Sequence, residues 1–255
     1  MVDVSTSLSR LRPSAGIALG PILFIIAILA VLAAAIAAGS GGFNANITTE
    51  GNKAAAEAII NYADQVSVAV QKLYVGNACA ISQINFNTGS LTGYTNPNAP
   101  ADGSCNVFNH DGGGILYMVP PSAYLDNVNT TGPNYGQWVV IGNMKIAAYA
   151  PAGDVIILLP YIPFSTCQLI NNMVGFSVTT TSNIPWVNSV HTVLNTPFAG
   201  TTAYSGSIVD NATVSSGATA AAKYQPTGCL WFDNWNYNTT SVTPTGIFYK
   251  VLIQQ

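Results

Sequence analysis

The feature that most constrains this chain is an uncharged apolar run that begins directly after Gly16. No charged residue lies between Arg12 and Glu50, and nearly every side chain from Ile17 to Ala38 is aliphatic. A helix needs about 20 apolar residues to cross the hydrocarbon core of a bilayer. The run therefore predicts a helix that enters a membrane at some stage.

The flanks of the run leave its fate open. A short polar leader with Arg10 and Arg12 precedes it and small residues end it, which is also the pattern of a secretory signal cleaved near Ala37 or Ala38. A permanent signal anchor fits the same residues, and so does the first half of a stalk helix. The residues after the run have to decide between these alternatives.

The residues from 39 onward favour a stalk. The sequence GSGG at 39–42 weakens a helix and predicts a break. Apolar side chains then recur at steps of three and four, with charged residues largely on another face, and Gly76 with Asn77 suits a helix end. A cleaved signal needs nothing helical after it, so we expect one stalk helix over 17–76. The apolar positions are Ala56, Ile59, Ile60, Ala63, Val66, Val70 and Leu73.

The composition excludes several classes of protein. Charged residues make up only 7% of the 255 residues, and the net charge is −3, so the chain lacks the basic surface that nucleic-acid binding requires. Hydrophobic residues make up 49%, enough for one sizeable core besides the apolar run. We expect one globular head on one stalk.

Four cysteines, Cys79, Cys105, Cys167 and Cys229, predict two disulfides in an exported chain. They include no CxxC pair, and the chain has only two histidines, so we expect neither a metal site nor a cofactor. Three pairings are compatible with the sequence. We prefer 79–105 with 167–229, because each pair then brackets one continuous segment.

After Gly76 the chain becomes rich in Asn, Gly, Thr and Pro, with short apolar stretches that predict strands. A short helix is expected over 165–174, with Ser165 as its N-cap. The predicted fold class is α+β, a long N-terminal helix packed on an antiparallel, disulfide-stapled head. The predicted strands are 114–119, 137–143, 145–150, 154–162, 174–181, 229–235 and 246–253.

With these features the chain resembles type IV pilins, and most of all the type IVb subgroup that includes the toxin-coregulated and bundle-forming pilins. A basic leader ending in Gly16 before an apolar helix starting at Ile17 is what the prepilin peptidase of that family cleaves and N-methylates. The stretch KAAAEAIINYADQVSVAVQKLYVGN is similar to the second half of a pilin stalk, and FSTCQLINNMVGFSVTTT resembles the type IVb pattern of a cysteine that opens a short helix. The resemblance implies that Cys229 closes the region 167–229.

The resemblance also implies an organisation and a function. Residues 1–16 become a leader peptide, 17–76 the stalk helix and 77–255 the pilin head. The chain is then expected to move from the inner membrane into an extracellular filament that supports adhesion, surface attachment or motility. Its partners would be other copies of itself, the prepilin peptidase, the pilus assembly machinery and, before assembly, the membrane. We expect no enzymatic activity.

One residue departs from the family pattern. Most pilins carry glutamate as the fifth residue after the cleavage point, and this chain has Pro21 there. The glutamate is thought to pair with the N-terminal ammonium of a neighbouring subunit, and Pro21 cannot do so. Proline does suit the first turn of a helix. Either register is set by packing alone or the chain is a minor, tip-located subunit.

A binding function is the competing hypothesis. Trp231, Asp233, Trp235 and Tyr237 would share one face of a strand and could bind sugar, although such an alternation more often belongs to a half-buried core strand. The chain would then be a secreted or anchored sugar-binding domain, or an adhesive tip pilin. Four sequons are candidate glycosylation sites, at Asn46, Asn129, Asn211 and Asn238.

Overall fold

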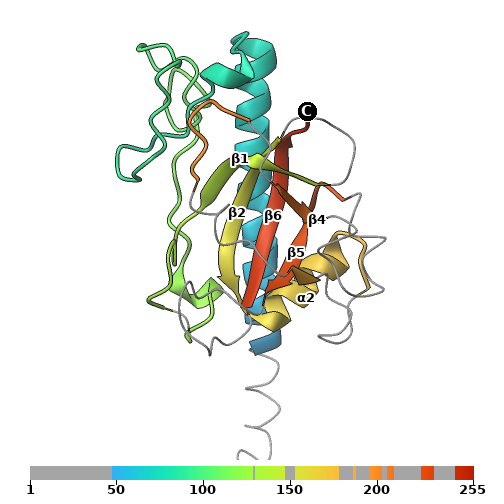
Figure 1. Ribbon diagram of the computed structural model, residues 1–255. Helices are drawn as coiled ribbons and strands as arrows, with labels where there is room; N and C mark the ends of the chain where they lie inside the picture. The colour runs from blue at the N-terminus through green and yellow to red at the C-terminus, as the bar shows by residue number, and fades with distance from the viewer. Residues whose placement is uncertain are drawn as a thin grey trace, which may run out of the picture. The chain divides into compact units, whose positions relative to one another are not determined.

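A long helix packed on an antiparallel sheet dominates the described part of the chain (Figure 1). The computed structural model divides the chain into two compact units, Met1–Thr49 and Glu50–Gln255, and almost all described residues belong to the second. The α+β class predicted from the sequence is confirmed at this level. The described residues are 48–128, 130–146, 153–177, 186–187, 196–202, 206–209, 225–232 and 245–255.

The long helix covers residues 48–76. It is α-helical as far as residue 71 and then forms one π-helical turn, η1 (Lys72–Gly76). Asn77 caps its end, and the Asn77 N–H donates to the Lys72 carbonyl oxygen at 3.1 Å. The predicted helix end at Gly76 and Asn77 is therefore confirmed.

The first part of the predicted stalk lies outside the described residues. This part includes the apolar run at 17–38 and the glycine-rich break at 39–42. Among the helices that are described, none combines the length and the apolar character needed to cross a bilayer.

The helix buries one face, as its periodicity predicts. Lys53 and Glu57 lie on the exposed side, and the apolar residues three and four apart form the buried stripe. Ile60 alone of the expected stripe is only partly buried. The buried apolar residues of this helix are Ala55, Ala56, Ile59, Tyr62, Ala63, Val66, Ala69, Val70 and Leu73.

Four antiparallel strands form the centre of the sheet, in the order β5-β6-β2-β1. Short strands β3 (Trp186–Val187) and β4 (Gly206–Val209) pair in parallel with the outer members β5 and β1. The central strands are β1 (Val139–Ile146), β2 (Asp154–Ile162), β5 (Thr227–Phe232) and β6 (Thr245–Ile253).

The central strand β2 is buried on both faces. Ile157 pairs with Lys250 of β6, and the Lys250 side chain reaches Asp64 of the long helix, so this row of residues faces the helix. The next row, with Leu158 and Tyr249, faces the other way and is buried too. All nine residues of β2 are buried, in keeping with the uninterrupted apolar sequence of the strand.

Most of the predicted strands are present. The range 154–162 matches β2, and β5 and β6 lie within two or three residues of their predicted ends. The predicted strands 137–143 and 145–150 join into β1, whose register shifts between Ile141 and Met144. Residues 147–150 lie outside the described part.

Two predicted strands are wrong where the structure describes them. Residues 114–119 form no strand: no described strand pairs with them, and on one side a tyrosine side chain bonds two of their main-chain groups. Residues 174–177 end a helix instead: Val174 is its C-cap, and Gly175 has a φ of 94°.

The short helix α2 (Phe164–Met173) confirms the prediction of a helix at 165–174. Its predicted N-cap is wrong, since Ser165 lies inside the first turn and Pro163 occupies the N-cap. The Pro163 carbonyl oxygen accepts the Cys167 N–H at 2.9 Å. Proline has no N–H to leave unsatisfied, so the helix starts there without a side-chain cap.

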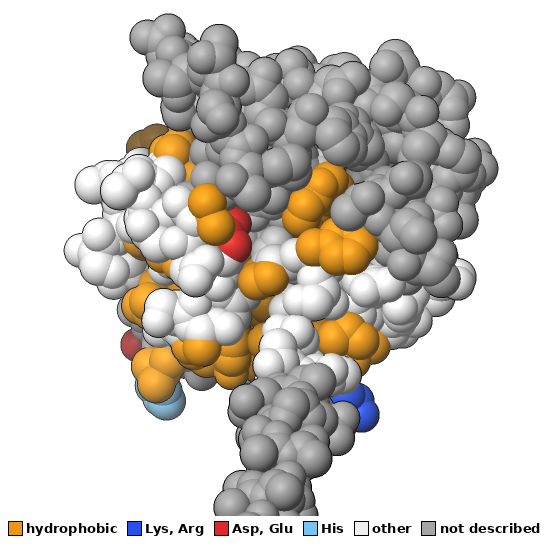
Figure 2. Space-filling view, turned by 90° about the horizontal axis from the view of Figure 1, so that it is seen from below, with side chains coloured by type: hydrophobic (Ala, Val, Ile, Leu, Met, Phe, Trp, Pro, Cys, Tyr) orange, Lys and Arg blue, Asp and Glu red, His pale blue; other side chains and the backbone are white. Residues whose placement is uncertain are grey.

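The surface of this unit carries little charge. Seen from below, hydrophobic and uncharged polar side chains intermingle, with few charged groups among them (Figure 2). This agrees with the 7% of charged residues in the sequence. Such a surface gives weak electrostatic repulsion between copies of the chain.

Candidate functional site

Most of the residues singled out in the sequence lie outside the described part. The structure places the four cysteines and Trp231 and leaves the other candidate site residues without a description. Those others are Gly16, Ile17, Pro21, Asn46, Asn129, Asn211, Asp233, Trp235, Tyr237 and Asn238. Within the described part, we take the contact between the long helix and the sheet as the candidate functional region.

An aromatic stack joins the long helix to the sheet. The Tyr62 ring lies 5.0 Å from the Trp138 ring, and Trp138 meets Phe248 of β6 edge to face at 6.0 Å between centroids. All three side chains are buried. Aromatic pairs at these separations add about 0.5–1.5 kcal/mol each beyond burial. The stack anchors the middle of the helix to the centre of the sheet.

An ion pair reinforces this junction. The Lys250 ammonium lies 2.6 Å from the Asp64 carboxylate and also donates to the Thr227 hydroxyl at 3.2 Å. The Lys250 side chain is only 16% exposed, whereas that of Asp64 is 49% exposed. Half-exposed pairs contribute little net stability, so the pair serves to orient the helix over β6.

Tyrosine hydroxyls hold the connection at 77–138 against the helix and sheet. Tyr62 donates to the Leu116 carbonyl oxygen at 3.3 Å and accepts the Met118 N–H at 2.9 Å. Tyr94 accepts the Val140 N–H at 3.0 Å, and Tyr117 accepts the Trp138 N–H at 3.3 Å. Burial raises the pKa of both Tyr62 and Tyr94 to about 12. These hydroxyls tie the connection to the long helix on one side and to the start of β1 on the other.

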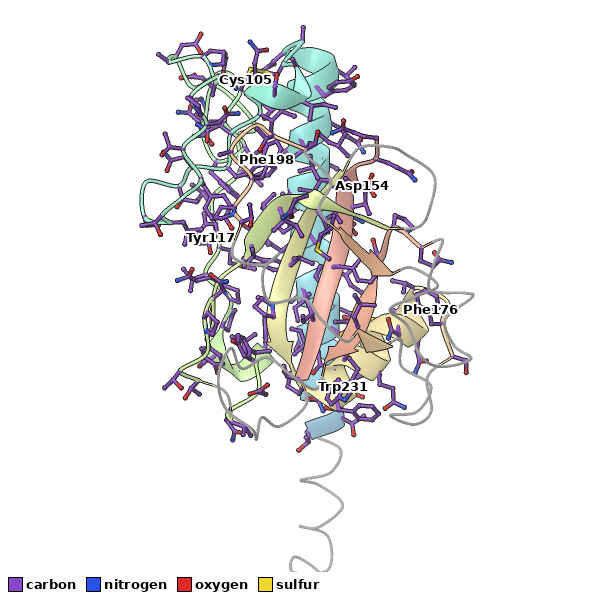
Figure 3. All side chains as sticks on the ribbon, viewed as in Figure 1. Cys105, Tyr117, Asp154, Phe176, Phe198 and Trp231 are labelled. Carbon is purple, nitrogen blue, oxygen red and sulfur yellow. A yellow bond between two sulfur atoms is a disulfide. The ribbon has the colours of Figure 1, made fainter. Side chains whose placement is uncertain are left out.

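The disulfide Cys79–Cys105 fastens the same connection to the end of the helix. The Cys79 N–H donates to the Leu73 carbonyl oxygen at 3.0 Å, and the Asn77 side chain donates to the Ser104 carbonyl oxygen at 2.8 Å. Figure 3 shows Cys105 beside the last turns of the helix. This bridge is one of the two pairings preferred from the sequence.

The second disulfide, Cys167–Cys229, joins α2 to β5 and is the other preferred pairing. Beside it, the Asn171 side chain makes two hydrogen bonds of 2.8 Å with the main chain of Cys229, one as donor and one as acceptor. Sequence reasoning missed Asn171. An asparagine inside a predicted helix was the available signal, because such residues are unfavourable there unless the side chain has a partner.

Trp231 belongs to the core in this structure. Its ring meets Phe164 of α2 edge to face at 5.4 Å, and only 8% of its surface is exposed. A tryptophan that stacks on a sugar must present an open ring face. Trp231 therefore fits the half-buried core strand better than an open binding face.

A tyrosine in an unusual backbone conformation holds the chain near Asp126 and Pro133 against β2. Tyr161 has a φ of 66° at a register shift between β2 and β6, and its hydroxyl donates to the Pro133 carbonyl oxygen at 3.0 Å. Gly132 lies directly against this hydroxyl, so a Cβ at Gly132 would overlap it. The carbonyl oxygen of Tyr161 also accepts the Asp126 N–H at 2.8 Å.

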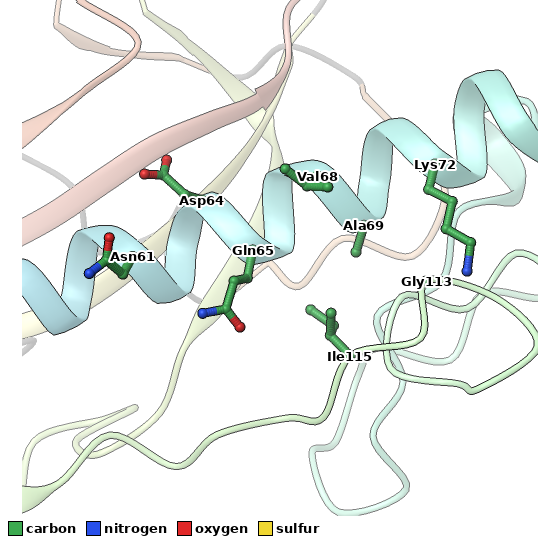
Figure 4. A pocket seen from close by; sticks show the side chains of 8 residues that line it. All are labelled: Asn61, Asp64, Gln65, Val68, Ala69, Lys72, Gly113 and Ile115. Carbon is green, nitrogen blue, oxygen red and sulfur yellow. The ribbon is translucent and has the colours of Figure 1, made fainter.

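A groove of about 500 Å³ opens on the outer face of the long helix (Figure 4). Its polar groups are two amides, the paired carboxylate of Asp64 and the ammonium of Lys72, above an apolar floor of Ala69 and Ile115. The described residues that line it include no histidine, cysteine or serine. They are Asn61, Asp64, Gln65, Val68, Ala69, Lys72, Gly113 and Ile115.

Among the described residues, no three histidine, cysteine or carboxylate side chains converge on a point where a metal could bind. What the geometry provides is a firm mounting: aromatic stacking and an ion pair hold the long helix on the sheet, one disulfide fastens the connection after the helix, and the other joins α2 to β5. Comparisons of this chain with protein families, with curated proteins and with solved structures find no match.

Proposed function

We propose that this chain is a structural subunit of an extracellular filament of the type IV pilus kind, assembled through its apolar N-terminal helix. One observation carries the proposal. A helix at 48–76 that is buried along one face of a disulfide-stapled sheet comes, in the sequence, after an uncharged apolar run long enough to cross a membrane. An apolar stalk mounted on a polar head is what such a subunit requires.

The apolar run supplies the driving force for assembly in this proposal. In the membrane, lipid surrounds residues 17–38 and the subunit remains a monomer with its head outside. In a filament, the stalks of other copies cover the same surface, and burial contributes about 25 cal/mol per Å², less the ordering cost of association. The small residues Ala33, Ala34, Ala35, Ala37 and Ala38 let helices approach closely.

Processing would precede assembly. A prepilin peptidase removes residues 1–16 and leaves Ile17 as the methylated N-terminus. Pro21 then lies in the first turn of the stalk, where a missing N–H has no cost. Without a glutamate at this position, register along the filament is set by packing of the stalks.

The head supports the proposal through its construction. A filament subunit receives force through its stalk and must pass it to the head without unfolding. The stack of Tyr62 on Trp138 and the ion pair of Asp64 with Lys250 join the long helix to the centre of the sheet. One disulfide fastens the chain that follows the helix, and the other joins α2 to β5. The inner membrane, the assembly machinery and other copies of the chain are the partners proposed.

The proposal is tested at the N-terminus of the mature protein. Mass spectrometry of protein taken from the native cell surface should find a chain that starts at Ile17, with or without a methyl group. Electron microscopy of the same material should show filaments that an antibody to the head decorates along their length. A mature chain that starts near Gly39 would mean that the run is a discarded signal peptide, and the filament proposal would be abandoned.

A minor subunit at the filament tip is a variant that Pro21 favours. Related pseudopilins tolerate the loss of the glutamate at a tip position. Antibody labelling restricted to filament ends would support this variant, and labelling along the shaft would exclude it. The sugar-binding alternative gains no support from the described residues, because Trp231 is buried against Phe164.

A further inference from the structure

An apolar segment of five residues, 115–119, lies beside the long helix, and no described strand pairs with it. We call it the edge segment. Its side chains alternate at first: Ile115 and Tyr117 pack on the core, while Leu116 and Met118 are exposed. The exposed fractions of Leu116, Met118 and Val119 are 86%, 37% and 66%.

The main chain of the edge segment is held on one side only. The Tyr62 hydroxyl bonds the Leu116 carbonyl oxygen and the Met118 N–H, two groups that lie two residues apart. Together with the alternation of side chains, this indicates an extended backbone, in which the N–H and C=O of the residue between point the opposite way. Among the described residues, the main-chain groups of Tyr117 have no hydrogen-bond partner.

The edge segment lacks the features that usually protect an unpaired strand. Charged side chains and prolines block pairing, but no charged residue lies between Asp111 and Asp126, and the prolines come after the segment, at 120 and 121. The Lys72 ammonium ends near Gly114, outside the segment. The sequence ILYMV combines high strand propensity with zero charge, which favours pairing with another strand.

We propose that the edge segment pairs with the edge segment of a second copy of this chain, antiparallel and across a twofold axis. The partner must offer an extended, uncharged, apolar segment with a free main-chain edge. The chain itself carries such a segment, and a twofold contact between identical patches is self-complementary. Because the segment carries no charge, two identical copies can approach each other without electrostatic repulsion.

The size of the contact determines where it matters. Five paired residues make a contact only about 17 Å long, which is too short to bury the roughly 800 Å² per partner of a stable dimer. A single pair is therefore weak, and the contact becomes effective only when many copies are presented together. This part of the inference rests on the proposed filament. A twofold axis cannot relate subunits of one polar filament, so the contact joins heads of two filaments lying side by side.

The test uses full-length protein in filaments sheared from the cell surface. Leu116→Lys places a charge in the contact, and Val128→Lys places one at another exposed apolar residue, 61% exposed, outside the segment. Filament length by electron microscopy reports assembly, and low-speed sedimentation reports side-by-side association. We expect Leu116→Lys to reduce the sedimenting fraction at least about tenfold while filaments keep their length, and Val128→Lys to change neither.

A second measurement identifies the occupant directly. A photo-crosslinking amino acid in place of Leu116 should link to the edge segment of another copy, seen by mass spectrometry of the joined peptides. Filaments that associate normally with Leu116→Lys would overturn the inference, and so would a cross-link to another protein or to another part of the chain. If wild-type material contains no filaments, the proposed function fails. The same cross-link is then measured on full-length chain reconstituted at high density in phospholipid vesicles, where many copies are presented together, and its absence there would overturn the inference.

Discussion

Asn171 and Cys229 are joined by two hydrogen bonds of 2.8 Å, so that the side-chain amide of α2 acts as a neighbouring strand for one residue of β5. Both residues are completely buried. The same two elements are joined covalently by Cys167–Cys229. The covalent bridge and the amide therefore hold one end of the sheet together, and they can be tested separately.

Asn171→Ala should destabilise the protein by about 2–4 kcal/mol, because it leaves a buried N–H and a buried C=O of Cys229 without partners. Urea unfolding with the disulfides intact measures the change. Met173→Ala, at an exposed position of the same helix, is the matched control and should stay within about 0.5 kcal/mol. Equal effects of the two substitutions would contradict the role of Asn171.

Removal of each disulfide should have effects that depend on loop length. Cys167 and Cys229 are 62 residues apart and Cys79 and Cys105 are 26 apart, for which chain entropy gives about 4.3 and about 3.5 kcal/mol. Double alanine variants, Cys167→Ala with Cys229→Ala and Cys79→Ala with Cys105→Ala, test this by urea unfolding. The first pair should lose more stability, since its cysteines are also more deeply buried. A larger loss of stability in the Cys79→Ala, Cys105→Ala variant would contradict the prediction.

Stability should fall at alkaline pH because of buried tyrosines. The pKa values of Tyr62 and Tyr94 are raised to about 12 by burial, against about 10 in an unfolded chain. The unfolded state therefore loses these protons first. The stability contribution is complete below pH 10 and is lost as the pH rises from 10 to 12.

For Tyr94 this loss amounts to roughly 2–3 kcal/mol. Burial raises the pKa of Tyr249 as well, in the same direction. Urea midpoints measured from pH 8 to pH 12 should be level at first and then decline above pH 10. A midpoint that does not change up to pH 12 would show that these hydroxyls ionise as freely in the folded state as in the unfolded one.

Gly132→Ala should destabilise the protein near Pro133. The new Cβ would overlap the Tyr161 hydroxyl and break its hydrogen bond to the Pro133 carbonyl oxygen. A loss of about 1–3 kcal/mol is expected from such overpacking. Gly51→Ala is the matched control with the opposite sign: it lies in the long helix with open space around it, and alanine should stabilise by about 0.5–1 kcal/mol. Thermal unfolding should give a lower melting temperature for Gly132→Ala and a higher one for Gly51→Ala than for the wild-type protein.

The sequence was sufficient where one pattern extends over many residues. The 3.6-residue period over 56–73 predicted the second half of the stalk helix, which the structure describes at 48–76, and the apolar run at 154–162 predicted β2. The two disulfides were preferred from the order of the cysteines alone. In these cases local pattern and tertiary packing favour the same structure.

The sequence was insufficient where a distant side chain decides the local structure. Residues 114–119 have the composition of a strand, yet no described strand pairs with them, and Tyr62, more than fifty residues earlier, takes the hydrogen bonds on one edge of the segment. The role of Asn171 likewise depends on Cys229, 58 residues later. Strands β3 and β4 are two and four residues long, too short to leave a period in the sequence.

The complete burial of β2 also limits how this protein can change over time. All nine of its side chains are enclosed, so a substitution there alters packing whichever face it falls on. The connection at 77–138 is different, because its turns are held by a disulfide and by a few hydroxyls while many of its side chains face solvent. Sequence drift should therefore accumulate in that connection and leave β2 almost untouched.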